Sequence, residues 1–162
     1  MILSYTRNKH TSTIDCEDNS ILSHSTVEDT FFAATVEMVV KIPDMEITSV
    51  KGTIERAFGE ECRKAIPLLQ KVKGLRIGPG IIKAIEQSVG GPEGCPRMTD
   101  LVWECCNSII LRFTVDSIAE IFSKEAGEQI EGHKELVRKN PRLIGSCAAF
   151  AERSPLMEGL EI

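Results

Sequence analysis

The sequence is poor in aromatic residues and has no cluster of basic residues. Only 5% of its 162 residues are Phe, Trp or Tyr, although hydrophobic residues make up 42%. We therefore expect a mainly aliphatic core, and the length suits one domain spanning residues 1–162. The net charge is −5, and no run of lysine and arginine exceeds two residues. Proteins that bind phosphate backbones need a clustered basic surface, so we expect no nucleic-acid partner.

Long apolar runs and paired cysteine motifs are also missing. No stretch approaches the ~20 apolar residues that span a membrane, and the N-terminus carries no apolar signal segment. We therefore expect a cytoplasmic protein with no membrane partner. Its six cysteines are expected to be mainly reduced thiols. No Cys-x-x-Cys pair occurs, so the usual zinc-binding spacing is missing as well.

Alternating apolar residues predict β-strands in the first third of the chain. The clearest strand places six side chains on one face, namely Phe32, Ala34, Val36, Met38, Val40 and Ile42. Residues 2–15 and 20–30 are polar and rich in threonine, which indicates two exposed strands or a loosely ordered hairpin. A further strand is expected at about residues 46–56. Its apolar phase changes, which predicts a bulge near Ser49 or Gly52.

Helical spacing replaces this alternation after residue 57. The first helix, over residues 62–72, contains Pro67, which predicts a kink or a new helix start there. Pro79 follows Gly78 at the opening of the second helix, in a first-turn position. The buried face of this helix is expected to contain Ile81, Ile82, Ile85 and Val89. A third helix is predicted to begin near Thr99 or Asp100, because either residue is a good N-cap.

The last part of the chain is predicted to contain a charged helix and a tail. Residues 124–139 have a thin apolar side, which is typical of a lid or a subunit contact. The predicted fold class is α+β: an antiparallel sheet of three to four strands in residues 1–57 packs against three to five helices in residues 58–140. The tail, residues 141–162, is expected to dock or to be partly ordered.

The glycine-rich segment of residues 74–106 is the strongest candidate for a functional site. Its second turn, residues 90–95, places the thiol of Cys95 at the start of a helix. Exposed N–H groups and the helix dipole at such a position favour anions, including a thiolate. Cys95 is therefore the candidate catalytic, reactive or metal-binding cysteine. The alternative is a structural side chain, because free cysteines are frequently buried.

Two arginines flank the glycine-rich turns, which points to an anionic ligand. The candidate ligand-binding residues are Arg76, Gly78, Gly80, Gly91, Gly94 and Arg97. The preferred interpretation is a non-enzymatic accessory module that holds a small anionic ligand or an acidic segment of a protein partner. Two alternatives stay open: a thiol-reactive or metal-binding protein that uses Cys95, and a structural subunit of a homo-oligomer that assembles through residues 124–139.

The motifs GLRIGPG at residues 74–80 and VGGPEGCPRMTDLV at residues 89–102 resemble a bacterial and archaeal family known only as domain of unknown function 2889. Members of that family typically show Gly-Leu-x-Ile-Gly-x-Gly and then Gly-Gly-x-x-Gly-Cys-Thr-His-Leu. The resemblance extends from about residue 36 to residue 147, where Ser-Cys-Ala is similar to a late cysteine segment of the family. It implies a shared fold and no particular activity.

The sequence departs from the family pattern directly after Cys95. Pro96 and Arg97 stand where the family has Thr-His, and Met98 replaces leucine. An arginine stays protonated, so Arg97 can hold an anion but cannot act as a base or a metal ligand. The resemblance also places Cys62, Cys95 and Cys147 at family-like positions. Three thiolates that converge could hold zinc or part of an iron–sulfur cluster. A metal of this kind is the only type of cofactor that we consider.

Overall fold

The structure is a computed structural model that describes residues 4–160. The chain divides into two compact units, Met1–Arg112 and Phe113–Ile162. The predicted α+β class is confirmed, because an antiparallel sheet of four strands precedes the helices. No helix within residues 4–160 is long and apolar enough to cross a membrane. The assignment of residues 1–162 to one domain stays a prediction.

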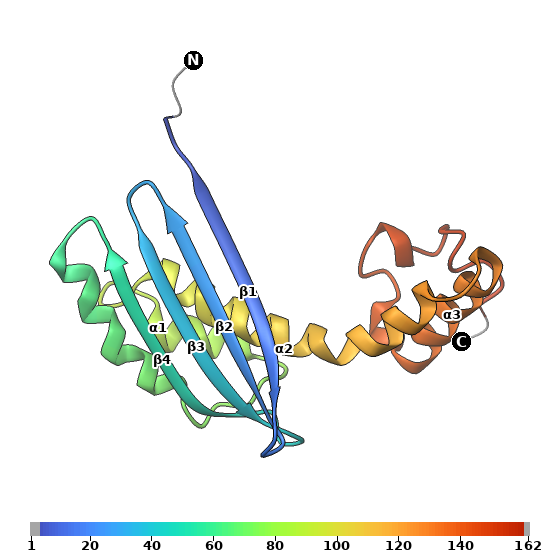
Figure 1. Cartoon of the computed structure of the whole chain (residues 1–162), viewed down its shortest axis with the longest axis horizontal. Coiled ribbons are helices and arrows are strands. Elements are labelled where there is room, and N and C mark those ends of the chain that lie inside the picture. The colour runs from blue at the N-terminus through green and yellow to red at the C-terminus, as the bar shows by residue number, and fades with distance from the viewer. Residues whose placement is uncertain (1–3, 161–162) are drawn as a thin grey trace. The chain divides into compact units, whose positions relative to one another are not determined.

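The first unit opens with an antiparallel sheet whose spatial order β1-β2-β3-β4 follows the chain (Figure 1). The strands are β1 (Arg7–Cys16), β2 (Ser20–Asp29), β3 (Ala33–Lys41) and β4 (Glu46–Arg56). In β3 the predicted alternation is confirmed, with Ala34, Val36, Met38 and Val40 all buried. The bulge expected near Ser49 is present one residue earlier. Thr48 is the extra residue there, because Val39 pairs with Ser49 and Val40 pairs with Ile47.

The expectation that the first two strands are exposed is wrong for β2. Alternate residues of β2 are buried, namely Ile21, Ser23, Ser25, Val27 and Asp29. Three of these five residues are polar. The buried hydroxyls have partners that the sequence alone does not reveal. Ser25 Oγ lies 2.8 Å from Thr11 Oγ1, and Ser23 Oγ lies 2.8 Å from Ser108 Oγ. A satisfied hydroxyl can be buried at little cost, so a polar strand can occupy the core side of the sheet.

Two helices follow the sheet, and both differ in detail from the prediction. The first, η1 (Glu60–Val72), is a 3-10 helix over its whole length and includes Pro67, so no fresh helix starts there. The second, α1 (Ile81–Val89), begins after Gly80, whose φ of 88° is left-handed. Pro79 therefore precedes the helix and is not in its first turn. Ile82 is 50% exposed and does not belong to the buried face of α1.

The third helix, α2 (Pro96–Phe122), begins earlier than expected and runs without a break into the second unit. Its first intrahelical bond joins the Thr99 N–H to the carbonyl of Cys95 at 3.0 Å. Thr99 is therefore inside the helix and is not its cap. A proline suits the first helical position because its missing N–H would have no intrahelical partner there.

The helices of the first unit cover one face of the sheet (Figure 1). The core joins side chains from every layer, for example Met38 of β3, Leu69 of η1, Ile85 of α1 and Leu101 of α2. Cys105 and Cys106 of α2 are both fully buried in this core.

The second unit contains the end of α2, then α3 (Ala126–Lys139) and two short 3-10 turns, η2 (Pro141–Leu143) and η3 (Ala148–Phe150). The predicted charged helix is confirmed as α3. Its surface carries ion pairs such as Lys139 with Glu135 at 2.8 Å and Arg138 with Glu131 at 2.7 Å. Pairs of this kind on exposed helix surfaces contribute only tenths of a kcal/mol each.

The turn between α1 and α2 leads to a testable prediction about Gly94. A Cβ atom at this position would overlap the backbone carbonyl oxygens of Val89 and Gly90. We expect Gly94→Ala to lower the free energy of unfolding by about 2 kcal/mol, because the backbone of the turn must move. Gly59→Ala is the matched control, since its Cβ would meet nothing within 4 Å. Urea denaturation of both variants tests this prediction, which equal stability would contradict.

Candidate functional site

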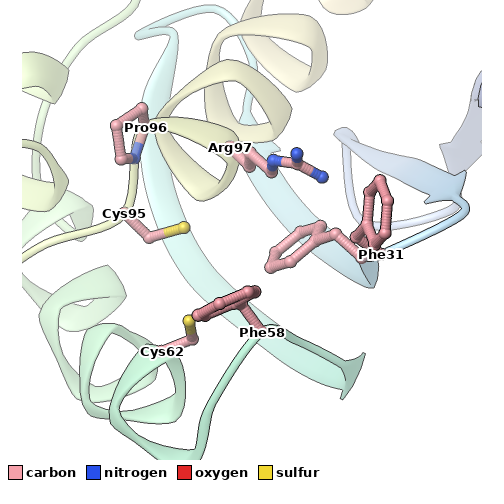
Figure 2. Close-up of a pocket in the computed structure, with 7 residues that line it drawn as sticks. Phe31, Phe58, Cys62, Cys95, Pro96 and Arg97 are labelled. Carbon is pink, nitrogen blue, oxygen red and sulfur yellow. The ribbon is translucent and has the colours of Figure 1, made fainter.

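An apolar pocket of about 420 Å³ lies in the first unit. Figure 2 shows its walls, which come from the β2–β3 turn, the segment before η1, η1 itself and the start of α2. The lining residues are Phe31, Phe32, Phe58, Cys62, Cys95, Pro96 and Arg97. Arg97 is the one charged residue among them. The pocket has the usual composition of a small-molecule site, with apolar walls and few polar groups.

The β2–β3 turn is held together by the side chain of Asp29. Its Oδ1 accepts hydrogen bonds from the N–H groups of Phe31 at 2.8 Å and Phe32 at 2.7 Å. The Asp29 N–H donates in turn to the Phe32 carbonyl at 2.7 Å. An aspartate that bonds the backbone N–H groups of the next residues is a common way to fix a turn. This turn presents both phenylalanine rings to the pocket.

The second carboxylate oxygen of Asp29 binds residues from distant parts of the chain. Oδ2 accepts from Arg7 of β1, through Nε at 3.1 Å and Nη2 at 2.9 Å, and from Nη1 of Arg97 in α2 at 2.5 Å. The hydroxyl of Tyr5 donates to the same oxygen at 3.2 Å. The Asp29 side chain is fully buried under these partners. One carboxylate thus ties together the N-terminal segment, the β2–β3 turn and the start of α2.

A third arginine lies close to this carboxylate. Arg56 of β4 joins the cluster by donating to the Asp29 carbonyl at 2.7 Å and to the Glu28 carboxylate at 3.1 Å. The guanidinium groups of Arg7, Arg56 and Arg97 are matched by three carboxylates, because Asp100 acts on Arg7 in addition to Asp29 and Glu28. The charges of the cluster therefore balance.

These contacts keep Asp29 ionised in the folded protein. Burial alone would raise the pKa of its carboxyl group. The hydrogen bonds from Phe31, Arg7 and Phe32, and the positive charge of Arg97, outweigh burial and hold the pKa well below its usual range. The carboxylate is consequently a fixed negative charge that orients both arginines at neutral pH.

Arg97 is held in place with part of its guanidinium group free. Its guanidinium carbon lies 4.9 Å from the centre of the Phe32 ring, a cation–π contact. Only Nη1 is hydrogen-bonded, to Asp29. Within residues 4–160, Nε and Nη2 have no acceptor, and the side chain is 36% exposed. The side edge of the guanidinium is therefore available to an anion.

Two phenylalanines of the pocket are unusually exposed. Phe58 is 98% exposed and Phe31 is 57% exposed, whereas Phe32 is buried. Phe58 lies in the short connection between β4 and η1, where Gly59 follows it. Figure 2 shows its ring beside the Cys62 side chain, and shows the Cys95 sulfur directed toward the space next to this ring. An apolar ligand in this space would cover surface that is otherwise wet.

The structure brings some of the sequence-predicted site residues together. Arg97, Cys62 and Cys95 line the same pocket. Gly94 lines a neighbouring pocket of about 550 Å³, which shares Cys62 with the first. Neither pocket is lined by four other candidates, namely Arg76, Gly78, Gly80 and Gly91. The two glycine-rich turns lie at opposite ends of α1, whose nine residues span about 13 Å.

The cysteines are distributed over both units. Cys147, the third cysteine of the suggested metal site, is exposed and belongs to the second unit. Among residues 4–160, no group of three or more His, Cys, Asp or Glu side chains is arranged to hold a metal ion. Burial raises the pKa of Cys105 to about 11 and that of Cys106 to about 12, so both thiols stay protonated. A role for Cys62 and Cys95 as ligands or nucleophiles stays a hypothesis.

The residues that organise the pocket are not among the sites predicted from the sequence. Asp29 lies in a segment that was expected to be exposed, and Arg7 was not a candidate. Phe31 and Phe58 were not identified as site residues either. The sequence does contain one indication of this turn, the order Asp-Thr-Phe-Phe between two strands. An aspartate at the start of a turn commonly fixes the conformation of the next residues.

Comparison with known proteins places the first unit in a family. The family described as Protein of unknown function (DUF2889) matches residues 7–111. The chain belongs to this family. The matched residues begin with β1 and nearly coincide with the first compact unit, so they include every residue of the pocket. The match ends before residue 147, although the motifs suggested that it would reach there. Among curated proteins and solved structures, no significant match was found.

The depressed pKa of Asp29 predicts how stability depends on pH. The pKa is lower in the folded than in the unfolded chain, where it is about 3.9. The stabilisation by the carboxylate is therefore complete above about pH 4 and is lost as the pH falls toward the folded-state pKa. We expect Asp29→Asn to lower the melting temperature by at least ~5 °C at pH 7 and by progressively less below pH 4.

Thermal unfolding of both proteins between pH 7 and pH 2.5 measures this difference. Asp44→Asn is the control, because Asp44 lies exposed in the turn before β4 and its substitution should change the melting temperature little. A melting-temperature difference that stays constant over the whole range would contradict the assignment of a depressed pKa to Asp29.

Proposed function

We propose that this chain is a non-enzymatic module that binds a small anionic ligand in the pocket beside Asp29. The observation that carries the proposal is the position of Arg97: it is the one charged residue of an apolar pocket and retains unbonded N–H groups. A charge-assisted hydrogen bond in an apolar pocket is stronger than the same bond in water.

The lining of the pocket supports binding over catalysis. No histidine, aspartate, glutamate, lysine or tyrosine lines it, so the two cysteine thiols are the only lining groups that could exchange a proton with a substrate. Arg97 stays protonated and therefore serves only to bind and orient. The remaining polar groups are the thiols of Cys62 and Cys95. Their presence in one pocket is the observation that favours the alternative, a thiol-reactive or metal-binding protein.

The rigidity of the site also supports ligand binding. Asp29 fixes the Phe31–Phe32 turn and the Arg97 side chain at once. A binding group that is already ordered loses little conformational entropy when the ligand arrives, and this improves affinity. Phe58 is not held in this way. Its ring is exposed, so it can contact a ligand without losing contacts with the rest of the protein.

The proposal predicts that Phe58→Ala weakens binding without affecting the fold. A suitable probe is 8-anilinonaphthalene-1-sulfonate, which joins an apolar ring system to one negative charge. We expect its affinity to fall about 5-fold or more, because the ligand loses an apolar wall. The melting temperature should stay nearly constant, since Phe58 is 98% exposed. Fluorescence titration and thermal unfolding measure these two quantities.

Ile14→Ala is the matched control for this experiment. Ile14 is 59% exposed on β1 and does not line the pocket. Equal dye binding by the native protein and both variants would contradict the proposal. Stoichiometric zinc in anaerobically purified protein, lost in Cys95→Ala, would favour the metal-binding alternative instead.

A further inference from the structure

The residues that line the pocket limit the chemical class of its ligand. Six of the seven lining residues are Phe, Cys or Pro, and Arg97 is the seventh. A sugar, a nucleotide or another ligand with many hydroxyl groups would leave those groups unpaired against phenylalanine rings. An unpaired buried polar group costs about 1–3 kcal/mol, so such ligands are disfavoured. The body of the ligand must be apolar.

The volume of the pocket sets the size of this apolar body. About 420 Å³ corresponds to roughly 14 water molecules at ~30 Å³ each. This space suits a short alkyl chain or a small ring system. A long lipid chain would extend beyond the pocket, and inorganic phosphate would leave most of the apolar surface wet.

The unbonded edge of Arg97 selects the anionic group. Asp29 occupies Nη1, which leaves Nε and Nη2 as neighbouring donors on one edge of the guanidinium. Two parallel N–H groups on one edge match the two oxygens of a carboxylate, which they bind in bidentate fashion. The cation–π contact with Phe32 holds the plane of the guanidinium and so fixes the direction of these donors. Arg97 is the one charged residue that lines the pocket, and a single guanidinium suits a monoanion better than a phosphate dianion.

We infer that the ligand is a small amphipathic monocarboxylate, whose apolar body fills the pocket between Phe31, Phe58 and Cys95 while its carboxylate binds the Nε–Nη2 edge of Arg97. This inference rests on the proposed function and specifies its ligand. The acid is a free small molecule, because the pocket has the volume of such a molecule and one charged group to hold it.

The experiment uses the full chain and two matched probes, octanoate and octan-1-ol, with inorganic phosphate as a third. The probes share an eight-carbon skeleton, and only octanoate carries the charge. Isothermal titration should give a dissociation constant at least ~10-fold lower for octanoate than for octan-1-ol, as expected for a charge-assisted bidentate pair. Phosphate should not bind.

A substitution at Arg97 separates the carboxylate contact from the apolar contact. Arg97→Lys keeps a positive charge for Asp29 but removes the two-donor edge. We expect it to weaken octanoate binding about 10-fold and to leave octan-1-ol binding unchanged. Arg138→Lys is the control, because Arg138 pairs with Glu131 on α3 and does not line the pocket. It should leave the affinities for both probes unchanged.

Several outcomes would overturn the inference. Equal affinities for octanoate and octan-1-ol would show that no carboxylate site exists. Phosphate binding that is tighter than octanoate binding would exclude an amphipathic ligand. Competition by an apolar peptide with an amidated C-terminus would indicate a protein segment as the occupant. If octanoate fails to bind while the dye still distinguishes Phe58→Ala, this inference fails and the proposed function stands; if both fail, neither stands.

Discussion

The structure of the first unit depends on one buried carboxylate. Asp29 ends β2, and both of its oxygens are used: one fixes the turn to β3, and the other binds two arginines and a tyrosine. A buried charge is costly unless it is paired and hydrogen-bonded, and the Asp29 carboxylate is both paired with arginines and hydrogen-bonded at both oxygens. Removing any one of these partners leaves the carboxylate with fewer compensating contacts. The cluster therefore behaves as a unit, and its members should show non-additive effects on stability.

The same carboxylate also determines the shape of the pocket. It positions Phe31 and Phe32 through their backbone N–H groups and Arg97 through its side chain. These three residues form one side of the pocket, while Phe58, Cys62 and Cys95 form the other. The stability of the fold and the proposed binding are thus coupled. A change at Asp29 should disturb the pocket even though the Asp29 side chain does not line it.

Much of the fold could be predicted from the sequence because local patterns dominate it. The alternation in β3, the bulge near Ser49 and the charged helix α3 are all consequences of nearby residues. The prediction failed for β2, whose buried serines are stabilised by partners far along the chain. Ser23 and Ser108 are separated by 85 residues, and no local pattern reveals such a pair.

The site was predictable only in part, for the same reason. Arg97 and Cys95 were identified because a glycine-rich turn and a helix start mark the region, and Cys62 was identified through the resemblance to the family. The role expected for Arg97 was based on its charge alone. Its partner Asp29 was missed because it lies 68 residues earlier in the chain. The exposed Phe58 has no distinctive sequence context, since exposure depends on packing that a single sequence does not show. Long-range pairs thus explain both the errors in the fold and the gaps in the site.

The central role of Asp29 can be tested by an NMR titration of its side-chain carboxyl carbon in the native protein, with Asp29→Asn to assign the signal. We predict a midpoint well below ~3.9, the ordinary value for aspartate, and a higher midpoint in Arg97→Lys, because lysine replaces a hydrogen bond at 2.5 Å with a weaker contact. A native midpoint at or above the ordinary value would contradict that role.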